Sequence, residues 1–448
     1  MMLQAVNPAD NTVIAEYPVD DFSTVEMHIG TAAHRFETWR LEPIEHRAAL
    51  IRKAADILRG KAGEFALLMA GEMGKPVREG RAEVEKCAWV CEYYADHAAG
   101  FLMDHPVSTG MRKSYVTYQP IGAVLAVMPW NFPFWQVFRF AAPNLTAGNT
   151  ALLKHASNVP GCARAIETVF ADAGFPDGVF RTLMIPGTRV AEVIGDPRVA
   201  AVTLTGSTPA GRAVAEAAGR HLKKTVLELG GSDPYLILED ADLDLAVEAC
   251  VTSRLLNTGQ SCIAAKRFIL VESIADVFME RFIDAMASRR FGDPIDSGAD
   301  IGPMARRDLR DDLHQQVLES IRRGARLRLG GEIPDLTGAW YPPTILDRVA
   351  PGMPAYRDEF FGPVAAVIAA RIANDTSFGL GAAVFTKDVE RGERIARNAL
   401  HAGCCAVNDF VRSDPRLPFG GVGESGYGRE LGVHGIHEFM NIKTVSVR

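Results

Sequence analysis

The chain has 448 residues, of which 48% are hydrophobic and 23% charged, a globular composition with room for two or three domains. Its formal net charge is -7 and it has no long basic run, so we expect no nucleic-acid partner. The most apolar stretch, IGAVLAVMPWNFPFWQVF, is broken by prolines and polar residues, and the first residues lack the features of a signal peptide. We therefore expect a cytoplasmic protein without a membrane anchor.

Seven cysteines are scattered along the chain. An odd number argues against a disulfide framework and for a reducing compartment. Cys87 and Cys91 form one close pair and Cys404 and Cys405 another, but neither has a partner pair at zinc spacing. His401 lies near the second pair and is interpreted as an ordinary histidine, so no metal site is expected.

The first hundred residues favour helices. Apolar residues recur at spacings of three and four between about 30 and 100, with a long helical segment over 76–94. The segment SYVTYQP then alternates apolar and polar residues, which is typical of an exposed strand.

From residue 121 to 229, short apolar strands alternate with helical stretches. The five strand candidates are GAVLAV, TALLK, VFRTLMI, AAVTLT and TVLEL. Strands joined in this way predict right-handed crossovers and a mainly parallel, doubly wound sheet. Ligands of such sheets bind at the carboxyl ends of the strands. The residues at those ends are Trp130, Asn131, Lys154, Gly206, Ser207 and Leu229.

A second alternating segment begins near Asp242 and predicts a second α/β domain. It contains a helix through Leu256, the strand KRFILVE, a helix over 275–288 and the strand-like PVAAVIAA. The closing IKTVSVR is typical of an edge strand that pairs outside its own domain.

The segment GVGESG, residues 421–426, matches the G-x-G-x-x-G spelling of a dinucleotide-binding loop. That motif needs a preceding strand, a following helix and an acidic residue about 20 positions on. Only twenty-two residues follow Gly426. We interpret the segment as a glycine-rich turn.

Three residues could carry covalent chemistry. Cys262 ends NTGQSC just after a helical stretch, Glu228 stands at the carboxyl end of a strand in LELGG, and Asn131 is held between two prolines in PWNFP. A thiolate is a nucleophile, a desolvated glutamate is a general base, and an amide can donate to an oxyanion. Each residue also has an ordinary alternative role. Cys262 would then be a structural cysteine, Glu228 a solvated loop carboxylate and Asn131 a helix cap.

Taken together, the motifs PWNFP, LLK, TGS, LELGG, GQSC, EFFGP and PFGG resemble the aldehyde dehydrogenase superfamily from end to end. The resemblance implies an α/β fold with two doubly wound domains and a small β oligomerisation arm. The dinucleotide-binding domain would cover 1–105 and 121–229, the catalytic domain 230–428, and the arm with the C-terminal strand 106–120 and 429–448. The family forms dimers or dimers of dimers, so a homo-oligomer is expected.

The resemblance also implies the role of each residue. Cys262 would be the nucleophile, Glu228 the base that activates water, and Asn131, with the Cys262 N–H, the oxyanion hole. Glu359 would hold the nicotinamide ribose beside Phe361. Ser207 would meet the pyrophosphate and Lys154 the adenosine ribose. Trp130, Gly206 and Leu229 would complete the cofactor site.

Cofactor preference depends on Ser157. Many NAD-preferring relatives resemble Lys-Pro-Ser-Glu where this chain has Lys154, His155, Ala156 and Ser157. A glutamate at that fourth position would repel a 2′-phosphate, and Lys154 can pair with one. We expect NADP to be preferred and NAD also used; the alternative is that both bind comparably.

Arg139, eight residues after Asn131, resembles the arginine that binds the far carboxylate in succinate semialdehyde dehydrogenases. Trp135 and Ser413 would line the same site, with Arg412 and Arg416 as possible further donors. The expected substrate is an aldehyde with a distal carboxylate, succinate semialdehyde.

Two positions depart from relatives. Leu256 stands where some succinate semialdehyde dehydrogenases have an arginine, and Ala264 where certain relatives have a second cysteine. Glutarate semialdehyde, glycolaldehyde and other short aldehydes therefore stay plausible substrates, and a redox switch is not expected.

An acylating enzyme that uses coenzyme A is disfavoured by Glu228, and a non-catalytic dinucleotide-binding protein is the remaining alternative.

Overall fold

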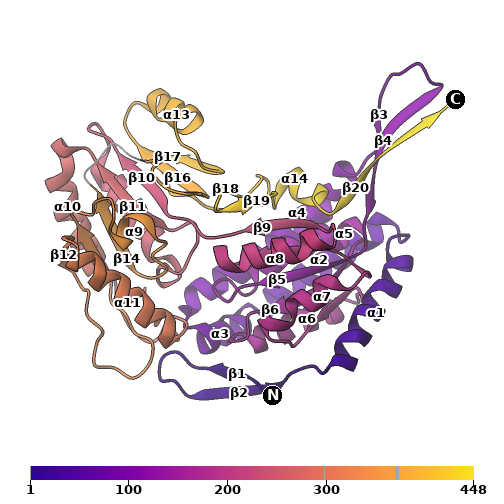
Figure 1. Cartoon of the computed structure of the whole chain (residues 1–448), viewed down its shortest axis with the longest axis horizontal. Helices are drawn as coiled ribbons and strands as arrows, with labels where there is room; N and C mark the ends of the chain where they lie inside the picture. Colours follow the sequence, from indigo (N-terminus) through magenta and orange to yellow (C-terminus); the bar gives the residue numbers. More distant parts are fainter. Residues whose placement is uncertain (1, 297, 369–372) are drawn as a thin grey trace.

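The computed structural model describes residues 2–296, 298–368 and 373–448. A six-stranded sheet with the order β19-β9-β8-β5-β6-β7 organises the first half of the chain (Figure 1). Every neighbouring pair is parallel except β19 with β9. Its strands are β5 (Ala123–Met128), β6 (Thr150–His155), β7 (Phe180–Thr182), β8 (Val199–Thr205), β9 (Lys224–Glu228) and β19 (Gly426–Tyr427).

Helices cover both faces of this sheet, because successive residues of a strand point to opposite sides. In β5, Val124 and Ala126 pack into a core shared with the helices on one side, whereas Ala123 and Leu125 pack into a second core on the other. The helices are α1 (Phe22–Trp39), α2 (Ile44–Gly60), α3 (Ala62–Met73), α4 (Val77–Phe101), α5 (Trp135–Ala147), α6 (Pro160–Asp172), η1 (Gly187–Arg189), α7 (Val190–Gly195) and α8 (Thr208–Arg220).

A seven-stranded sheet with the order β12-β13-β14-β11-β10-β16-β17 forms the second unit. Only the β12–β13 pair is antiparallel. Its strands are β10 (Asp233–Ile237), β11 (Ala265–Leu270), β12 (Arg326–Leu329), β13 (Thr344–Asp347), β14 (Val364–Ile368), β16 (Gly381–Phe385) and β17 (Cys404–Val407). Residues 369 and 370 of the expected strand PVAAVIAA lie outside the described residues.

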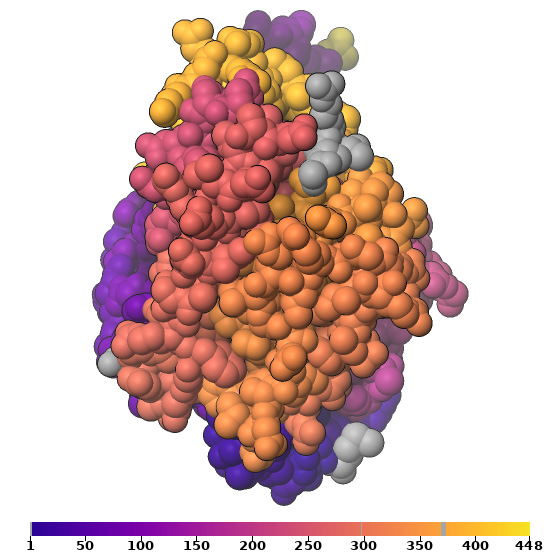
Figure 2. Space-filling view, turned by 90° about the vertical axis from the view of Figure 1, so that its left-hand side faces the viewer, coloured from indigo at the N-terminus to yellow at the C-terminus, as the bar shows by residue number. Residues whose placement is uncertain are grey.

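This sheet is also doubly wound, since Phe268 and Ile269 of β11 belong to cores on opposite faces. The helices of this part of the chain are α9 (Leu243–Leu255), η2 (Leu256–Gly259), α10 (Glu272–Ala287), α11 (Arg307–Arg322), α12 (Pro354–Arg357) and α13 (Val389–Asn398). Figure 2 shows the face that this second unit dominates, with the N-terminal segment below and the C-terminal segment above. Two doubly wound sheets are the architecture that the sequence predicts.

A three-stranded sheet forms an arm that projects from the first unit and ends at the C-terminus (Figure 1). It consists of β3 (His105–Pro106), β4 (Lys113–Pro120) and β20 (Met440–Val447). The closing strand β20 runs antiparallel to β4 along its whole length and lies at the edge of the sheet. The short helix α14 (Gly432–His437) leads into β20.

The N-terminal hairpin of β1 (Met2–Val6) and β2 (Val13–Pro18) was not expected from the sequence. Its turn contacts the second unit, because the N–H of Ala339 donates to the Pro8 carbonyl oxygen at 2.7 Å and the Trp340 indole to that of Ala9 at 2.9 Å. The hairpin therefore links segments that are more than three hundred residues apart in sequence.

The GVGESG segment forms the turn that the sequence predicts. It contains β18 (Val422–Gly423), which pairs with β15 (Phe378–Gly379), and the first residue of β19. Gly423 and Gly426 have φ angles of 62° and 103°, where glycine is favoured.

No helix within the described residues combines the length and the apolar character needed to cross a membrane.

Candidate functional site

Cys262 lies in the loop between η2 and β11, and the backbone before it is unusual. Asn257 and Thr258 adopt left-handed conformations with φ of 57°, and Gly259 follows with φ of 72°. A Cβ atom on Gly259 would overlap the carbonyl of Gly362, so the loop packs directly on the EFFGP segment. The GQSC and EFFGP motifs are thus one structural unit.

Cys262 opens onto two cavities. The first has a volume of about 250 Å³. The second has a volume of about 190 Å³. Cys262 and Gln136 line both, so the thiol is accessible from two sides.

Burial raises the pKa of the Cys262 thiol to about 12, an effect that the positive charges of Lys266 and Arg139 partly offset. The negative charges of Glu359 and Glu228 add to the increase. In this arrangement the thiol is protonated at neutral pH, so a base is needed to make it a nucleophile.

Asn131 is 3% exposed and lines the first cavity together with Cys262. Its Nδ2 donates to the Gln260 carbonyl oxygen at 3.1 Å, and its Oδ1 accepts from Nε2 of Gln136 at 3.1 Å. A side-chain amide has two N–H groups, so one remains for a ligand. The fixed amide beside the thiol has the chemistry of an oxyanion-hole donor.

Glu228 is 2% exposed, and neither of its carboxylate oxygens has a hydrogen-bond partner within the described residues. Burial raises the pKa of this carboxyl well above its usual value, and the charge of Glu430 raises it further, against the effect of Arg139 and Arg429. A desolvated carboxylate of this kind is a stronger base than a solvated one. It lies behind the cavity walls rather than in them.

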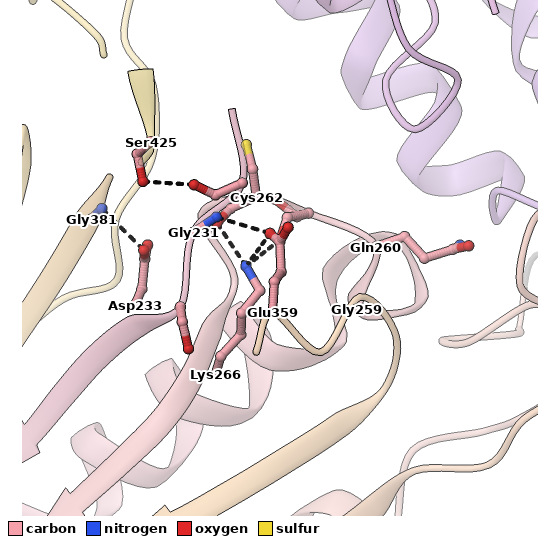
Figure 3. Close-up of polar contacts among 12 residues, drawn as sticks. Gly231, Asp233, Gly259, Gln260, Cys262, Lys266, Glu359, Gly381 and Ser425 are labelled. Atoms are coloured by element: carbon pink, nitrogen blue, oxygen red, sulfur yellow. Dashed lines mark hydrogen bonds and ion pairs between the residues drawn. The ribbon is translucent and has the colours of Figure 1, made fainter. Parts of the chain in front are cut away.

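Glu359 is held by the second sheet (Figure 3). Its Oε1 accepts from the Gly231 N–H at 3.0 Å and lies 3.1 Å from Nζ of Lys266. The same Lys266 ammonium donates to the Cys262 carbonyl oxygen at 2.7 Å. Lys266 therefore connects the loop that carries Cys262 to the carboxylate of Glu359.

The end of β9 is supported by the GVGESG turn. The Ser425 hydroxyl donates to the Gly230 carbonyl oxygen at 2.6 Å, as Figure 3 shows, and accepts from the Gly379 N–H at 3.0 Å. The Leu229 N–H donates to the Ser425 carbonyl oxygen at 3.1 Å. The turn thus fixes the backbone of LELGG.

Most of the expected cofactor residues line the first cavity. They are Trp130, Gly206, Ser207, Leu229, Glu359 and Phe361. The rings of Trp130 and Phe361 meet edge to face with centroids 5.7 Å apart. Ser207 is the N-cap of α8, and a helix N-terminus favours an anion.

Lys154 and Ser157 are not in the wall of that cavity. Lys154 is buried at the end of β6, where burial lowers its pKa, and no carboxylate in the described residues pairs with it. Ser157 is exposed and lines a separate cavity of about 500 Å³ with Arg306 and Arg307.

The expected substrate residues Arg139, Trp135 and Ser413 all line the second cavity. Arg139, however, already forms a buried ion pair with Glu430 and donates to the Thr205 hydroxyl at 3.3 Å. Leu256 lies in the same wall.

Several residues of the site were not expected from the sequence. Glu430, Lys266 and Lys86 lie in segments without a recognisable motif, and only their position in space shows their importance. Glu83 was also missed; its carboxylate accepts from the N–H groups of Phe134 and Trp135 at 2.9 Å each. A buried carboxylate fixing the start of α5 leaves no local signal in a helical sequence such as RAEVEKCAWV.

Within the described residues, no three or more His, Cys, Asp and Glu side chains lie close enough together to hold a metal ion.

The thiol, the carboxylate, the amide and the two cavities form one site suited to covalent thiol chemistry on a doubly wound α/β fold. Residues 1–445 match the model of the aldehyde dehydrogenase family, and the chain belongs to this family. It is an aldehyde dehydrogenase.

Individual relatives are similar over their full length. The chain is 49% identical to a probable succinate-semialdehyde dehydrogenase [NADP(+)] from Synechocystis, with 99% of each chain covered. It is 48% identical to the succinate semialdehyde dehydrogenase [NAD(P)+] Sad from Escherichia coli, covering 98% of this chain and 97% of the relative. The crystal structure of succinic semialdehyde dehydrogenase from Streptococcus pyogenes with NADP+ is 36% identical, with a TM-score of 0.97 and 99% of each chain covered.

Proposed function

We propose that this enzyme oxidises succinate semialdehyde to succinate with NADP as the preferred cofactor and NAD as a second one. The observation that carries the proposal is the second cavity, which has the Cys262 thiol in one wall and the cationic groups of Lys86, Arg139 and Arg412 in others. An aldehyde with a negative charge at its far end matches that distribution. The names of the two bacterial relatives support the same substrate and cofactors.

We infer that the first cavity takes the nicotinamide and pyrophosphate part of a dinucleotide. The N-terminus of α8 at Ser207 would hold the pyrophosphate. Lys154, at the end of β6, lies outside the wall of this cavity and would meet the cofactor beyond it. A Cβ on Gly230 would overlap the Glu359 carboxylate, so glycine keeps that part of the cavity open. When bound, the nicotinamide accepts the hydride that leaves the aldehyde carbon.

In the oxidation half, the Cys262 sulfur forms a bond to the aldehyde carbon. The free Asn131 N–H and the Cys262 backbone N–H donate to the oxygen as it becomes an alkoxide. Because the thiol has a raised pKa, it releases its proton to the solvent of the open cavity as the sulfur attacks. After loss of the hydride equivalent, Cys262 carries the acyl group as a thioester.

In the hydrolytic half, Glu228 removes a proton from water as the water attacks the thioester carbon. The C–S bond then breaks, and succinate and the free thiol are released. The raised pKa of Glu228 makes its carboxylate a stronger base than an exposed glutamate.

The NADP preference rests on charge. Ser157 carries no carboxylate to repel a 2′-phosphate, and the Lys154 ammonium can pair with it. Comparable binding of NAD and NADP is the alternative outcome.

A broader aldehyde specificity is the second candidate function. The observation that favours it is Leu256, an apolar side chain in the wall of the substrate cavity. Glutarate semialdehyde, glycolaldehyde and simple aliphatic aldehydes would then be oxidised by the same chemistry.

The test is kcat/KM, followed by reduced-cofactor absorbance, for succinate semialdehyde and for butanal with NADP and NAD. A lost charge-assisted contact is worth ~1.5 to 3 kcal/mol, so the proposal expects about a 10- to 100-fold preference for the semialdehyde. Equal values for the two aldehydes would favour the broad enzyme, and a preference for NAD would contradict the cofactor assignment.

We also propose that residues 1–105 and 121–229 form a dinucleotide-binding domain and 230–428 a catalytic domain. In the same proposal, residues 106–120 and 429–448 assemble the chain into a dimer or tetramer. The exposed apolar side chains of Val107, Met111 and Ile442 on the arm support an interface there. Light scattering would then give a mass of two or four chains of 48.6 kDa, whereas a monomer would exclude the assembly.

A further inference from the structure

Lys86 projects from α4 into the cavity that Cys262 shares with Trp135 and Ser413. Its Nζ donates to the Ser413 hydroxyl oxygen at 2.8 Å and lies 4.4 Å from the centroid of the Trp135 ring. Both partners are uncharged. The ammonium is therefore fixed in position without a counter-ion.

The other cations of the cavity wall already have partners. Arg139 is paired with the buried Glu430, and Arg412 with the exposed Asp409. No carboxylate of the described residues forms an ion pair with Lys86. An incoming anion thus finds one uncompensated positive charge in this cavity, and it belongs to Lys86.

The carboxylates of the wall are engaged elsewhere. Glu83 accepts from backbone N–H groups at the start of α5 and pairs with Lys75. Glu79 accepts from the Asn257 N–H at 2.7 Å, and burial raises its pKa to about 7. Neither therefore neutralises the ammonium of Lys86.

The pKa of Lys86 is lowered, as expected for a buried ammonium without a carboxylate partner. Burial lowers its pKa to about 8, and the positive charge of Arg139 lowers it further, while Asp414, Glu83 and Cys87 act in the opposite direction. A carboxylate in contact with the ammonium would favour its charged form.

We propose that Lys86 is the residue that recognises the distal carboxylate of the aldehyde, with the Ser413 hydroxyl as the second donor. The Ser413 oxygen accepts from Lys86 and keeps its own hydrogen for the ligand. Arg139 instead holds Glu430 beside Glu228. The inference rests on the proposed function, because it assigns the specificity of the same site.

The test compares wild type, Lys86→Met and Lys86→Arg by the ratio of kcat/KM for succinate semialdehyde to that for butanal, with NADP. Lys86→Met should lower the ratio about 10- to 100-fold, mainly through KM for the semialdehyde, because a charge-assisted contact is lost. Lys86→Arg keeps the charge and should retain part of the preference. The matched control is Lys53→Met on α2, which removes the same charge; this exposed lysine does not line the cavity, so the ratio should stay at the wild-type value.

A wild-type preference that persists in Lys86→Met would overturn the inference and leave the proposed function standing. No preference in the wild type would contradict the proposed function itself.

The wild-type pH profile is a second measurement that needs no variant. Since kcat/KM reports the free enzyme, the ratio should fall as the pH rises through about 8 and Lys86 loses its proton. A ratio that stays flat across that range would also overturn the assignment.

Discussion

At the scale of residues, a half-buried thiol and a buried carboxylate belong to one site, and desolvation favours the uncharged form of both. The pKa of Cys262 is raised to about 12, and that of Glu228 is raised well above its usual value. A thiol that gives up its proton only on attack is protected from reaction before the substrate arrives. The Glu228 carboxyl with the raised pKa holds a proton more strongly than an exposed glutamate does, so its ionised form is the stronger base.

The pH dependence of Cys262 alkylation tests this arrangement. Below the raised pKa the thiol is protonated, so its thiolate fraction should rise about tenfold per pH unit through neutral and alkaline pH. The measurement is the rate of iodoacetamide labelling of the Cys262 peptide in the enzyme without cofactor, with Cys262→Ser as the control. A rate that levels off near neutral pH would show that the thiolate is stable there and that our account of the site is wrong.

At the scale of elements, the site depends on the contact between two loops, one before β11 and one before β14. Gly259 has a φ of 72° and faces the carbonyl of Gly362 without room for a Cβ. The motifs GQSC and EFFGP could be recognised in the sequence, but nothing in either spelling shows that their backbones touch. Such contacts are created by the sheet that brings β11 and β14 together.

Gly259→Ala should therefore destabilise the protein by about 2 to 4 kcal/mol, through overpacking and a left-handed backbone that alanine resists. It should also lower activity by displacing the Cys262 loop. Gly60→Ala is the matched control, because its Cβ would meet no atom within 4 Å. Urea unfolding midpoints and turnover of both variants check the prediction, which fails if the two substitutions have equal effects.

The length, burial and flanking residues of each strand explain which strands the sequence predicts. Candidates such as GAVLAV and AAVTLT are continuous apolar runs buried on both faces, as parallel strands are, and were recognised. The strands β10, β13 and β16 were missed, being only four or five residues long and flanked by glycines, prolines or polar residues. The N-terminal hairpin was also missed; its two strands pair with each other, and only the contact of its turn with residues 339 and 340 depends on the rest of the fold.

At the scale of the whole molecule, the two sheets and the C-terminal segment converge on Cys262. The turn at 421–426 supports β9 through Ser425, and Glu430 reaches Arg139 from the segment that leads to the arm. Sequence motifs predict catalytic roles for Cys262, Glu228 and Asn131, which stand in recognisable spellings, and these roles stay predictions. Lys86 and Glu430 were not predicted, since their importance comes from charges that only the folded chain brings together.

In the proposed mechanism, an acyl group from succinate semialdehyde is carried on Cys262 and released by water that Glu228 activates. The most direct test is a single turnover of Glu228→Gln with succinate semialdehyde and NADP, quenched in acid and analysed by intact mass and peptide mapping. We expect one succinyl group to accumulate on the peptide that carries Cys262, because formation of the thioester proceeds while its hydrolysis is slowed. Undiminished turnover without an adduct, or an adduct on a different cysteine, would contradict it.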